Sequence, residues 1–246
     1  MRAIDTLRVK LFSDGADLDS ILAQYRNPRI KGFTTNPTLM RKAGILDYES
    51  FARNLLREVP DRPISLEVFA NDEQSMEDQA RAIASWGPNV NVKIPVTDQA
   101  GVFMGPLIQR LSRDGITVNV TAILTLRQVE LAAGALHSAT PAIVSVFAGR
   151  IADTGVDPVP VMKRARRLLE ARPRAELLWA SPRELLNIFQ ADSAGCHIIT
   201  VPPEILSKLS LVGKDLSNYS LETVSMFHRD AHAAAYRIQT AASLPV

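Results

Sequence analysis

The chain has 246 residues, of which 46% are hydrophobic, and its formal net charge at pH 7 is +2. A chain of this size and apolar content can bury a full core, whereas so small a charge argues against a surface that wraps nucleic acid. The single cysteine, Cys196, excludes an intramolecular disulfide and is at home in a reducing compartment. Because the sequence shows no signal peptide and no apolar run of transmembrane length, we expect a cytoplasmic protein with no membrane or nucleic-acid partner.

Short runs rich in β-branched residues alternate with stretches of helical periodicity along the whole chain. In chain order, the predicted strands are residues 9–14, 30–36, 64–70, 90–96, 117–123, 143–149, 176–181 and 196–201. The clearest helices between them are predicted over residues 73–86, 126–137, 158–171 and 182–192, each opening near a Pro, Asp or Ser that suits a helix start. A last helix is expected over residues 217–240.

This alternation of strands and helices predicts the fold class. Such units form parallel sheets through right-handed crossovers, and eight of them in 246 residues match the number and size of an α/β fold, the (β/α)8 TIM barrel. We therefore expect one domain over residues 1–246 with an extra C-terminal helix. A doubly wound open sheet is the alternative, but no Gly-x-Gly-x-x-Gly follows the first strand.

The fourth predicted strand carries a lysine among apolar neighbours. Val90, Val92 and Ile94 alternate with Asn91 and Lys93, so a strand sends the aliphatic side chains to one face and the amide and amine to the other. In a sheet covered on both faces Lys93 is buried, which disfavours an ammonium ion and suits an amine nucleophile for carbonyl compounds. A buried Lys–Glu ion pair, or a lysine that extends to the strand end, are the structural alternatives.

Other predicted strands also place polar groups on the face that would line the barrel. Barrel interiors are usually filled by Val, Ile and Leu, and active sites lie at the carboxyl ends of the strands. Polar residues there cost stability unless they serve a site. The set comprises Asp14, Thr34, Asn36, Glu67, Asn119, Thr121 and Ser145, followed by Phe147.

These residues suit the chemistry of an amine nucleophile. Glu67 could shuttle protons while an iminium forms, through a water held by Thr121, and Asp14 could act as acid and base on a substrate hydroxyl. Asp14 could instead cap the following helix, but Asp17 is the better cap because the periodic segment follows it directly.

Five motifs, which run in order along most of the chain, are similar to those of the transaldolase family. They are Leu11-Phe12-Ser13-Asp14, Gly32-Phe33-Thr34-Thr35-Asn36-Pro37-Thr38, Val92-Lys93-Ile94-Pro95-Val96-Thr97, Asn119-Val120-Thr121 and Ser145-Val146-Phe147-Ala148-Gly149-Arg150. The resemblance implies a class I mechanism without metal or cofactor, in which Lys93 forms a Schiff base with a ketose phosphate, Asp14 is the acid and base, and Glu67 and Thr121 handle the catalytic water.

The resemblance also implies a substrate-binding set. Asn36, Asn119 and Ser145 would hydrogen-bond a dihydroxyacetone unit beside Phe147, and we add Thr34 to this set. Arg150, Ser181 and Arg183 would hold the phosphate, which guanidinium groups suit.

Two activities occur among the proteins that the chain resembles, transaldolases and fructose 6-phosphate aldolases. The aldolases typically carry Gln and Tyr where this chain has Glu67 and Phe147, which favours transfer over simple aldol cleavage. An aldolase-like enzyme joining or cleaving small carbonyl compounds is the alternative, since Pro182 replaces a more familiar aromatic residue and leaves the geometry of Arg183 open. A barrel that binds sugar phosphates without catalysis is the second alternative.

Two further expectations concern metals and assembly. His228 and His232 are four residues apart on a predicted helix but have no third ligand at convincing spacing, so we expect no metal. The last helix carries apolar residues at helical spacing that could pack on its own barrel or on a neighbour's, and the resemblance makes a homo-oligomer the expectation.

Overall fold

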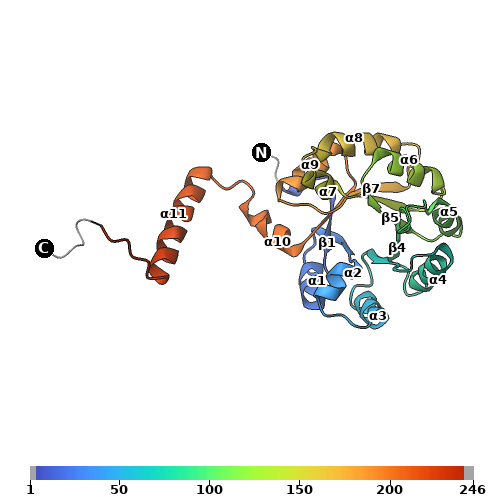
Figure 1. The fold of residues 1–246 in the computed structure, drawn as a ribbon, viewed down its shortest axis with the longest axis horizontal. Coiled ribbons are helices and arrows are strands. Elements are labelled where there is room, and N and C mark those ends of the chain that lie inside the picture. The colour runs from blue at the N-terminus through green and yellow to red at the C-terminus, as the bar shows by residue number, and fades with distance from the viewer. Residues whose placement is uncertain (1–3, 241–246) are drawn as a thin grey trace.

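The computed structural model describes residues 4–240, and its central element is a closed barrel of eight parallel strands in sequence order (Figure 1). This confirms the predicted TIM barrel. The strands are β1 Lys10–Asp14, β2 Ile30–Thr34, β3 Ile64–Glu67, β4 Val90–Pro95, β5 Val118–Ile123, β6 Ala142–Val146, β7 Ala175–Trp179 and β8 Ile198–Val201.

Helices surround the barrel and connect its strands (Figure 1). They are α1 Leu18–Tyr25, α2 Pro37–Lys42, α3 Tyr48–Glu58, α4 Glu73–Ala84, α5 Gly105–Arg113, α6 Leu126–Ala135, α7 Ala148–Asp153, α8 Pro158–Leu168 and α9 Leu186–Ala194. After β8 come α10 Pro203–Leu206 and α11 Leu216–Ala233, and two short 3₁₀ helices are η1 Ile4–Thr6 and η2 Ser207–Leu211. No helix within residues 4–240 is long and apolar enough to cross a membrane.

Strand alternation divides the apolar residues between two regions. The outward faces pack against the helices, as Val92 and Ile94 do in the large core cluster. A smaller cluster lies on the other side of the strands and consists of Phe12, Ile143, Leu178, Ala180 and Ile198, with Phe147 against it. Because this second cluster draws on β1, β6, β7 and β8, it fills part of the lumen below the polar residues at the strand ends.

Gly32 explains how Phe12 fits inside the lumen. A Cβ atom on Gly32 of β2 would lie 2.5 Å from the ring of Phe12 on β1, so the ring occupies the space that a side chain on Gly32 would need. The glycine of the second motif is therefore a packing requirement.

Several predicted boundaries are wrong. β2 ends at Thr34 rather than at residue 36, β3 at Glu67 rather than at residue 70 and β7 at Trp179 rather than at residue 181, and β8 starts at Ile198 rather than at residue 196. Two further departures concern β6 and α9. The sixth strand was predicted to reach residue 149, but β6 ends at Val146 and α7 starts at Ala148. The helix predicted to start at Pro182 begins at Leu186, because Ser181 has a left-handed backbone with φ +57° and the chain turns before α9. By contrast Asp17 caps α1, where its side chain accepts a hydrogen bond from Ser20 N, as predicted.

The last helix leaves the barrel. Figure 1 shows α11 at the end of an arm that extends from α10, and none of the residues of α11 is buried. Of the predicted range 217–240, the helix covers residues 217–233 and the rest continues without regular structure.

Candidate active site

Lys93 lies near the carboxyl end of β4 with its side chain inside the barrel, and it is 6% exposed. Its Nζ atom lies 2.8 Å from Glu67 Oε2 and donates a 2.7 Å hydrogen bond to the backbone carbonyl oxygen of Thr35. Glu67 is level with Lys93 on the adjacent strand β3, so the sheet register itself brings the two charges together. The amine is therefore buried, as predicted, and is held by two acceptors, one on β3 and one on the residue that follows β2.

The Lys93–Glu67 contact is the ion pair that the sequence left open as an alternative. A buried pair of this kind is weak support for stability, because desolvation offsets most of the attraction. It is also chemically useful, since a carboxylate at 2.8 Å can take the proton that the ammonium group must lose before it can act as a nucleophile. The geometry of the Lys93–Glu67 contact is compatible both with a structural ion pair and with proton transfer from the lysine.

Asp14 ends β1 at the mouth of the barrel, where it is partly buried. Thr34 Oγ1 donates a 2.7 Å hydrogen bond to Asp14 Oδ1 from the neighbouring strand β2. Burial raises the pKa of Asp14 above its ordinary value, and the hydrogen bond from Thr34 and the positive charge of Lys93 only partly offset this. A carboxyl group with a raised pKa is suited to taking up and returning a proton.

Asn119 and Ser145 lie side by side in the lumen on β5 and β6 and are both buried. Ser145 Oγ donates a 2.7 Å hydrogen bond to Asn119 Oδ1, and Asn119 Nδ2 donates a 3.1 Å bond to Ser65 Oγ on β3. This chain of polar contacts spans three strands and fixes the orientation of the Asn119 amide. Ser65 thus orients a predicted site residue, although sequence reasoning assigned no role to it.

Thr121 is 1% exposed and lies on β5 beside Pro95 of β4. The next residue, Ala122, has a positive φ of +62°, and the pairing of β5 with β6 changes register at this point. Left-handed backbone at a non-glycine residue is uncommon and is often found at functional sites.

A second irregularity brings Ser181 close to β6 and α7. Ser181 has a φ of +57°, and a Cβ atom on Gly149 would lie 1.5 Å from its carbonyl oxygen. Gly149 is therefore required where the chain leaves β6 and meets the turn after β7, because any side chain would displace the Ser181 backbone.

The two predicted phosphate-binding arginines lie near one another but differ in their contacts. Arg150 lies over the ring of Phe147, with 5.1 Å between the guanidinium carbon and the ring centroid. Arg183 binds Asp153 of α7 through two hydrogen bonds of 2.9 and 2.5 Å and donates a third, of 3.1 Å, to the Ser181 carbonyl oxygen. The guanidinium group of Arg183 is thus engaged by a carboxylate, whose own pKa it lowers.

Asn36 lies at the junction of β2 and α2. Its Oδ1 atom accepts a 3.0 Å hydrogen bond from Leu39 N and caps α2, so its NH₂ group is what it can offer a ligand. This capping function adds to the predicted role, since the cap fixes the side chain at the end of the strand.

Sequence reasoning missed several groups that hold the site. The carbonyl oxygen of Thr35 carries no signal in a sequence, because every residue has one. The hydroxyl of Thr200 on β8 is in hydrogen-bond contact with Thr34 Oγ1. Thr200 lies two residues after Ile198 and therefore on the same face of the strand, so the alternation argument could have found it.

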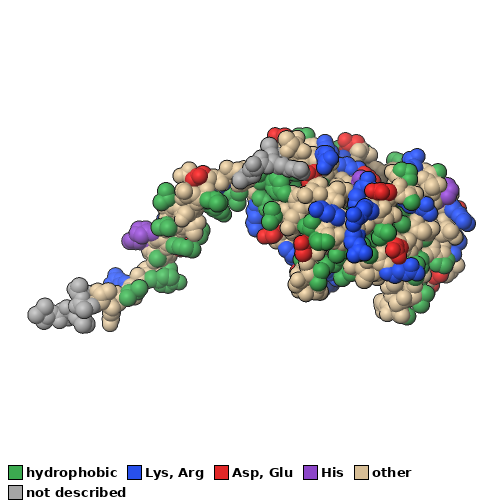
Figure 2. Space-filling view, turned by 90° about the horizontal axis from the view of Figure 1, so that it is seen from above, with side chains coloured by type: hydrophobic (Ala, Val, Ile, Leu, Met, Phe, Trp, Pro, Cys, Tyr) green, Lys and Arg blue, Asp and Glu red, His purple; other side chains and the backbone are tan. Residues whose placement is uncertain are grey.

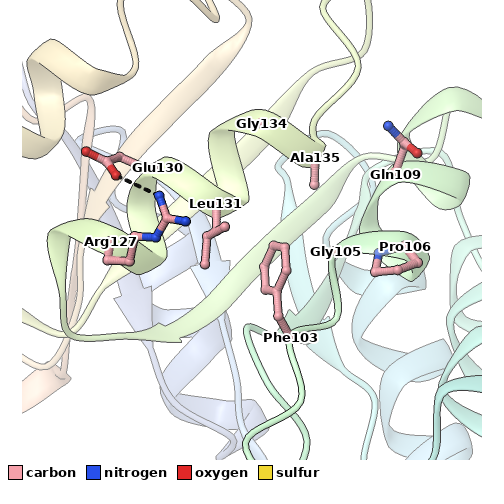
Figure 3. Close-up of a pocket in the computed structure, with 9 residues that line it drawn as sticks. All are labelled: Phe103, Gly105, Pro106, Gln109, Arg127, Glu130, Leu131, Gly134 and Ala135. Atoms are coloured by element: carbon pink, nitrogen blue, oxygen red, sulfur yellow. Dashed lines mark hydrogen bonds and ion pairs between the residues drawn. The ribbon is translucent and has the colours of Figure 1, made fainter.

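A separate groove lies outside the barrel between α5 and α6 (Figure 3). It has a volume of about 410 Å³ and is lined by residues that include Phe103, Leu131 and the Arg127–Glu130 ion pair. None of the predicted site residues lines it, so the groove is separate from the candidate active site in the lumen.

The fold and the lumen define the class: a TIM-barrel protein whose lumen holds a buried lysine, two carboxylates and a network of hydroxyl and amide groups. The chain belongs to the transaldolase/fructose-6-phosphate aldolase family, because the model of that family matches residues 11–243.

Curated relatives agree with this family. The chain is 36% identical to a protein named probable transaldolase from Dehalococcoides mccartyi. The two align over 202 residues, which are 82% of this chain and 90% of that protein. The chain is 33% identical over 218 residues to a probable transaldolase from Streptococcus agalactiae, with 87% and 95% covered. Among solved structures, dihydrodipicolinate synthase from Thermotoga maritima superimposes with a TM-score of 0.59 at 14% identity, over 92% of this chain and 81% of that one. This last likeness shows the fold alone.

Proposed function

We propose that the protein is a class I transaldolase, which transfers a dihydroxyacetone unit from a ketose phosphate to an aldose phosphate through a Schiff base on Lys93. The observation that carries the proposal is the buried Lys93 amine in contact with Glu67, in the same lumen as Asp14. Membership of a family that contains transaldolases, and relatives named probable transaldolase, support the same activity.

The residues divide the reaction between them. Lys93 Nζ attacks the carbonyl carbon of the ketose phosphate, and Glu67, with a water at Thr121, moves the protons that let the carbinolamine oxygen leave as water. Asp14 then takes the proton of the β-hydroxyl, the bond between the α and β carbons breaks, and its electron pair moves toward the iminium nitrogen. The shortened aldose phosphate leaves, and the three-carbon enamine stays on Lys93.

The second half of the reaction reverses these steps on an acceptor. The enamine carbon attacks the acceptor aldehyde, Asp14 returns its proton to the new hydroxyl, and water releases the product ketose from Lys93. In this proposal Asn36, Asn119 and Ser145 hold the hydroxyl groups of the three-carbon unit, with Thr34 and Phe147 beside them.

Transfer is favoured over free aldol cleavage by the apolar side chain at Phe147. A phenylalanine offers no hydroxyl that would help water to release the bound three-carbon unit, so the unit waits for an acceptor. An aldolase-like activity is the second candidate, and the engagement of Arg183 by Asp153 favours it, because a guanidinium group that is already paired binds a phosphate less readily.

Substrate phosphate is assigned to Arg150, Ser181 and Arg183. Arg150 lies over Phe147 and forms no ion pair with a carboxylate among residues 4–240, so its N–H donors can bind an anion. Arg183, by contrast, must exchange Asp153 for the phosphate. The sugar phosphate and acceptor proposed here would place the enzyme in carbohydrate metabolism of the pentose phosphate type in the cytoplasm.

Steady-state kinetics test the proposal. With fructose 6-phosphate as donor, we expect turnover that depends on added erythrose 4-phosphate and that is abolished in Lys93→Met, a variant that keeps an unbranched side chain, one atom shorter, and removes the amine. Release of free dihydroxyacetone at the same rate without acceptor would establish the aldolase instead. Binding of fructose 6-phosphate by the wild type without any turnover would establish a barrel that only binds sugar phosphates.

We also propose that the protein is a homo-oligomer in which α11 packs on a second copy. The helix extends away from its own barrel and exposes large apolar side chains that water would otherwise surround (Figures 1 and 2). They are Leu216, Tyr219, Leu221, Val224, Met226 and Phe227.

A further inference from the structure

Two threonines from strands that are not neighbours meet inside the barrel next to Asp14. Thr34 lies on β2 and Thr200 on β8, the two strands that flank β1, and in the sheet register Thr34 is level with Asp14 and Thr200 with Phe12. Their hydroxyl groups are in hydrogen-bond contact, and both side chains are buried, with exposures of 3% and 5%. Thr34 Oγ1 also lies 2.7 Å from Asp14 Oδ1.

Asp14, Thr34 and Thr200 form a short chain of hydrogen bonds, and the direction of donation along it depends on whether Asp14 is protonated. A threonine hydroxyl has one hydrogen to donate and can also accept. When Asp14 is ionised, Thr34 donates to the carboxylate, so the hydrogen between the two threonines must come from Thr200. When Asp14 is protonated, its own O–H can donate to Thr34, and Thr34 then donates to Thr200.

We propose that Thr200 is a positioning residue that allows Asp14 to take up and return a proton, by giving Thr34 a donor in one state and an acceptor in the other. This inference rests on the proposed role of Asp14 in cleaving and forming the carbon–carbon bond. Without the Thr200 hydroxyl, a proton taken up on Asp14 Oδ1 would leave the Thr34 hydrogen buried and unpaired, and a buried unpaired donor is costly.

The cost falls unequally on the two states of Asp14. In the ionised state Thr34 keeps its bond to Asp14 Oδ1 and lacks only a donor to one lone pair, whereas with a proton on Oδ1 it lacks a partner for its hydrogen. Removing the Thr200 hydroxyl therefore makes Asp14 a weaker base at Oδ1, the oxygen that Thr34 faces. The charged groups that face Asp14 are Lys93 from β4, Glu67 from β3 and Glu204 from α10, and all three are unchanged by a substitution at Thr200.

The experiment compares Thr200→Val, which keeps the shape and removes the hydroxyl, with Thr200→Ser, which keeps the hydroxyl and removes a methyl group. The carboxyl carbon of Asp14 is titrated by ¹³C NMR in the wild type and in both variants, and kcat and KM for cleavage of fructose 6-phosphate are measured across pH. We expect Thr200→Val to lower the pKa of Asp14, to move the acid limb of kcat/KM to lower pH, and to reduce kcat about tenfold with little change in KM.

The serine variant should restore the wild-type pKa and rate, which a defect of packing alone would not allow. An Asp14 pKa that is unchanged or higher in Thr200→Val, or a loss of rate that Thr200→Ser shares, overturns the inference. If Thr200→Val does not fold, Thr200→Ala and Thr200→Ser carry the same comparison. A wild type without cleavage activity refutes the proposed function separately, because the carboxyl titration still reports whether Thr200 controls the proton on Asp14.

Discussion

At the scale of residues, the lumen contains one buried amine and two carboxyl groups, on β4, β3 and β1. These groups differ in how they affect the free energy of unfolding. Lys93 and Glu67 are in contact, whereas Asp14 is held by a neutral hydroxyl and its pKa is raised mainly by burial. An acid whose pKa is raised by folding binds its proton more tightly in the folded than in the unfolded chain. Its contribution to stability is present below the ordinary value of 3.8 and is lost as pH rises through the raised folded value.

Asp14→Asn should therefore stabilise the fold at neutral pH while it removes the proposed acid and base. We expect the free energy of unfolding at pH 7 to rise by about 1 kcal/mol, since the amide avoids burial of a charge and keeps an oxygen for Thr34. The gain should shrink as pH falls through the raised folded pKa and should reach its minimum below 3.8, where Asp14 is protonated in both states. Urea unfolding at several pH values measures this.

Asp17→Asn is the matched control, because Asp17 is a helix cap outside the lumen and asparagine caps about as well as aspartate. Its stability should stay close to that of the wild type. An Asp14→Asn variant that is less stable than the wild type at pH 7 would show that attraction to Lys93 outweighs desolvation of Asp14.

Alternation along the strands was sufficient to predict most of these residues, because a side chain's face follows from its parity. It placed Lys93, Glu67 and Asp14 on the lumen side, and the structure puts all three there. It could not predict that the amine of Lys93 reaches the carbonyl oxygen of Thr35 just after β2, or that Thr34 meets Thr200 across β1. Those contacts depend on how closely non-adjacent strands approach inside a closed barrel, which parity does not determine.

At the scale of elements, the junction between β6 and α7 depends on a single missing side chain. Gly149 approaches the backbone of Ser181 so closely that a Cβ atom would lie 1.5 Å from its carbonyl oxygen. Gly149→Ala should therefore force the turn after β7 to move and cost about 3 kcal/mol of unfolding free energy. It should also raise KM for phosphorylated donors, because Ser181 and Arg183 move with the turn.

Gly134→Ala provides the control, since Gly134 lies in α6 with nothing within 4 Å of its added Cβ. There alanine should stabilise the helix by up to about 1 kcal/mol. Thermal unfolding tests this prediction: the melting temperature of Gly149→Ala should lie below that of the wild type and that of Gly134→Ala should not. Equal melting temperatures of the two variants would contradict the close approach at Ser181.

The strand count and order could be predicted, whereas element ends near the site could not. Residues 147–149 continue a β-like pattern in the sequence, yet the pairing of β6 with β7 ends at Val146 and Trp179 and the chain turns into α7 from Ala148. Pro182 has the character of a helix start, but the left-handed backbone at Ser181 delays α9 to Leu186. Both departures occur at the carboxyl ends of strands, where loops serve the site and local propensity is overruled.

At the scale of the whole molecule, the barrel is built as a unit and α11 lies apart from it, with its apolar side chains gathered along the arm (Figure 2). The single domain over residues 1–246 stays a prediction, and so does the homo-oligomer. An exposed apolar helix is unfavourable in water unless another surface covers it.

Sedimentation velocity tests the assembly. The wild type should sediment as an oligomer, and Val224→Asp combined with Phe227→Asp should yield the 27.0 kDa monomer, because both residues are exposed on α11 and charges there oppose burial. Ser225→Asp on the same helix, which adds a charge without removing an apolar side chain, should keep more of the assembly. A wild type that sediments as a monomer at micromolar concentration would refute the proposal.

The most direct test of the account as a whole is to identify the atom that carries the transferred carbons. The protein is incubated with fructose 6-phosphate, reduced with borohydride and digested, and its peptides are analysed by mass spectrometry, with Lys93→Met treated in parallel. The account predicts a reduced three-carbon adduct on Lys93 alone, which disappears when erythrose 4-phosphate is added before reduction. An adduct on another lysine, or none on Lys93 with a protein that still transfers the unit, would contradict the Schiff-base mechanism.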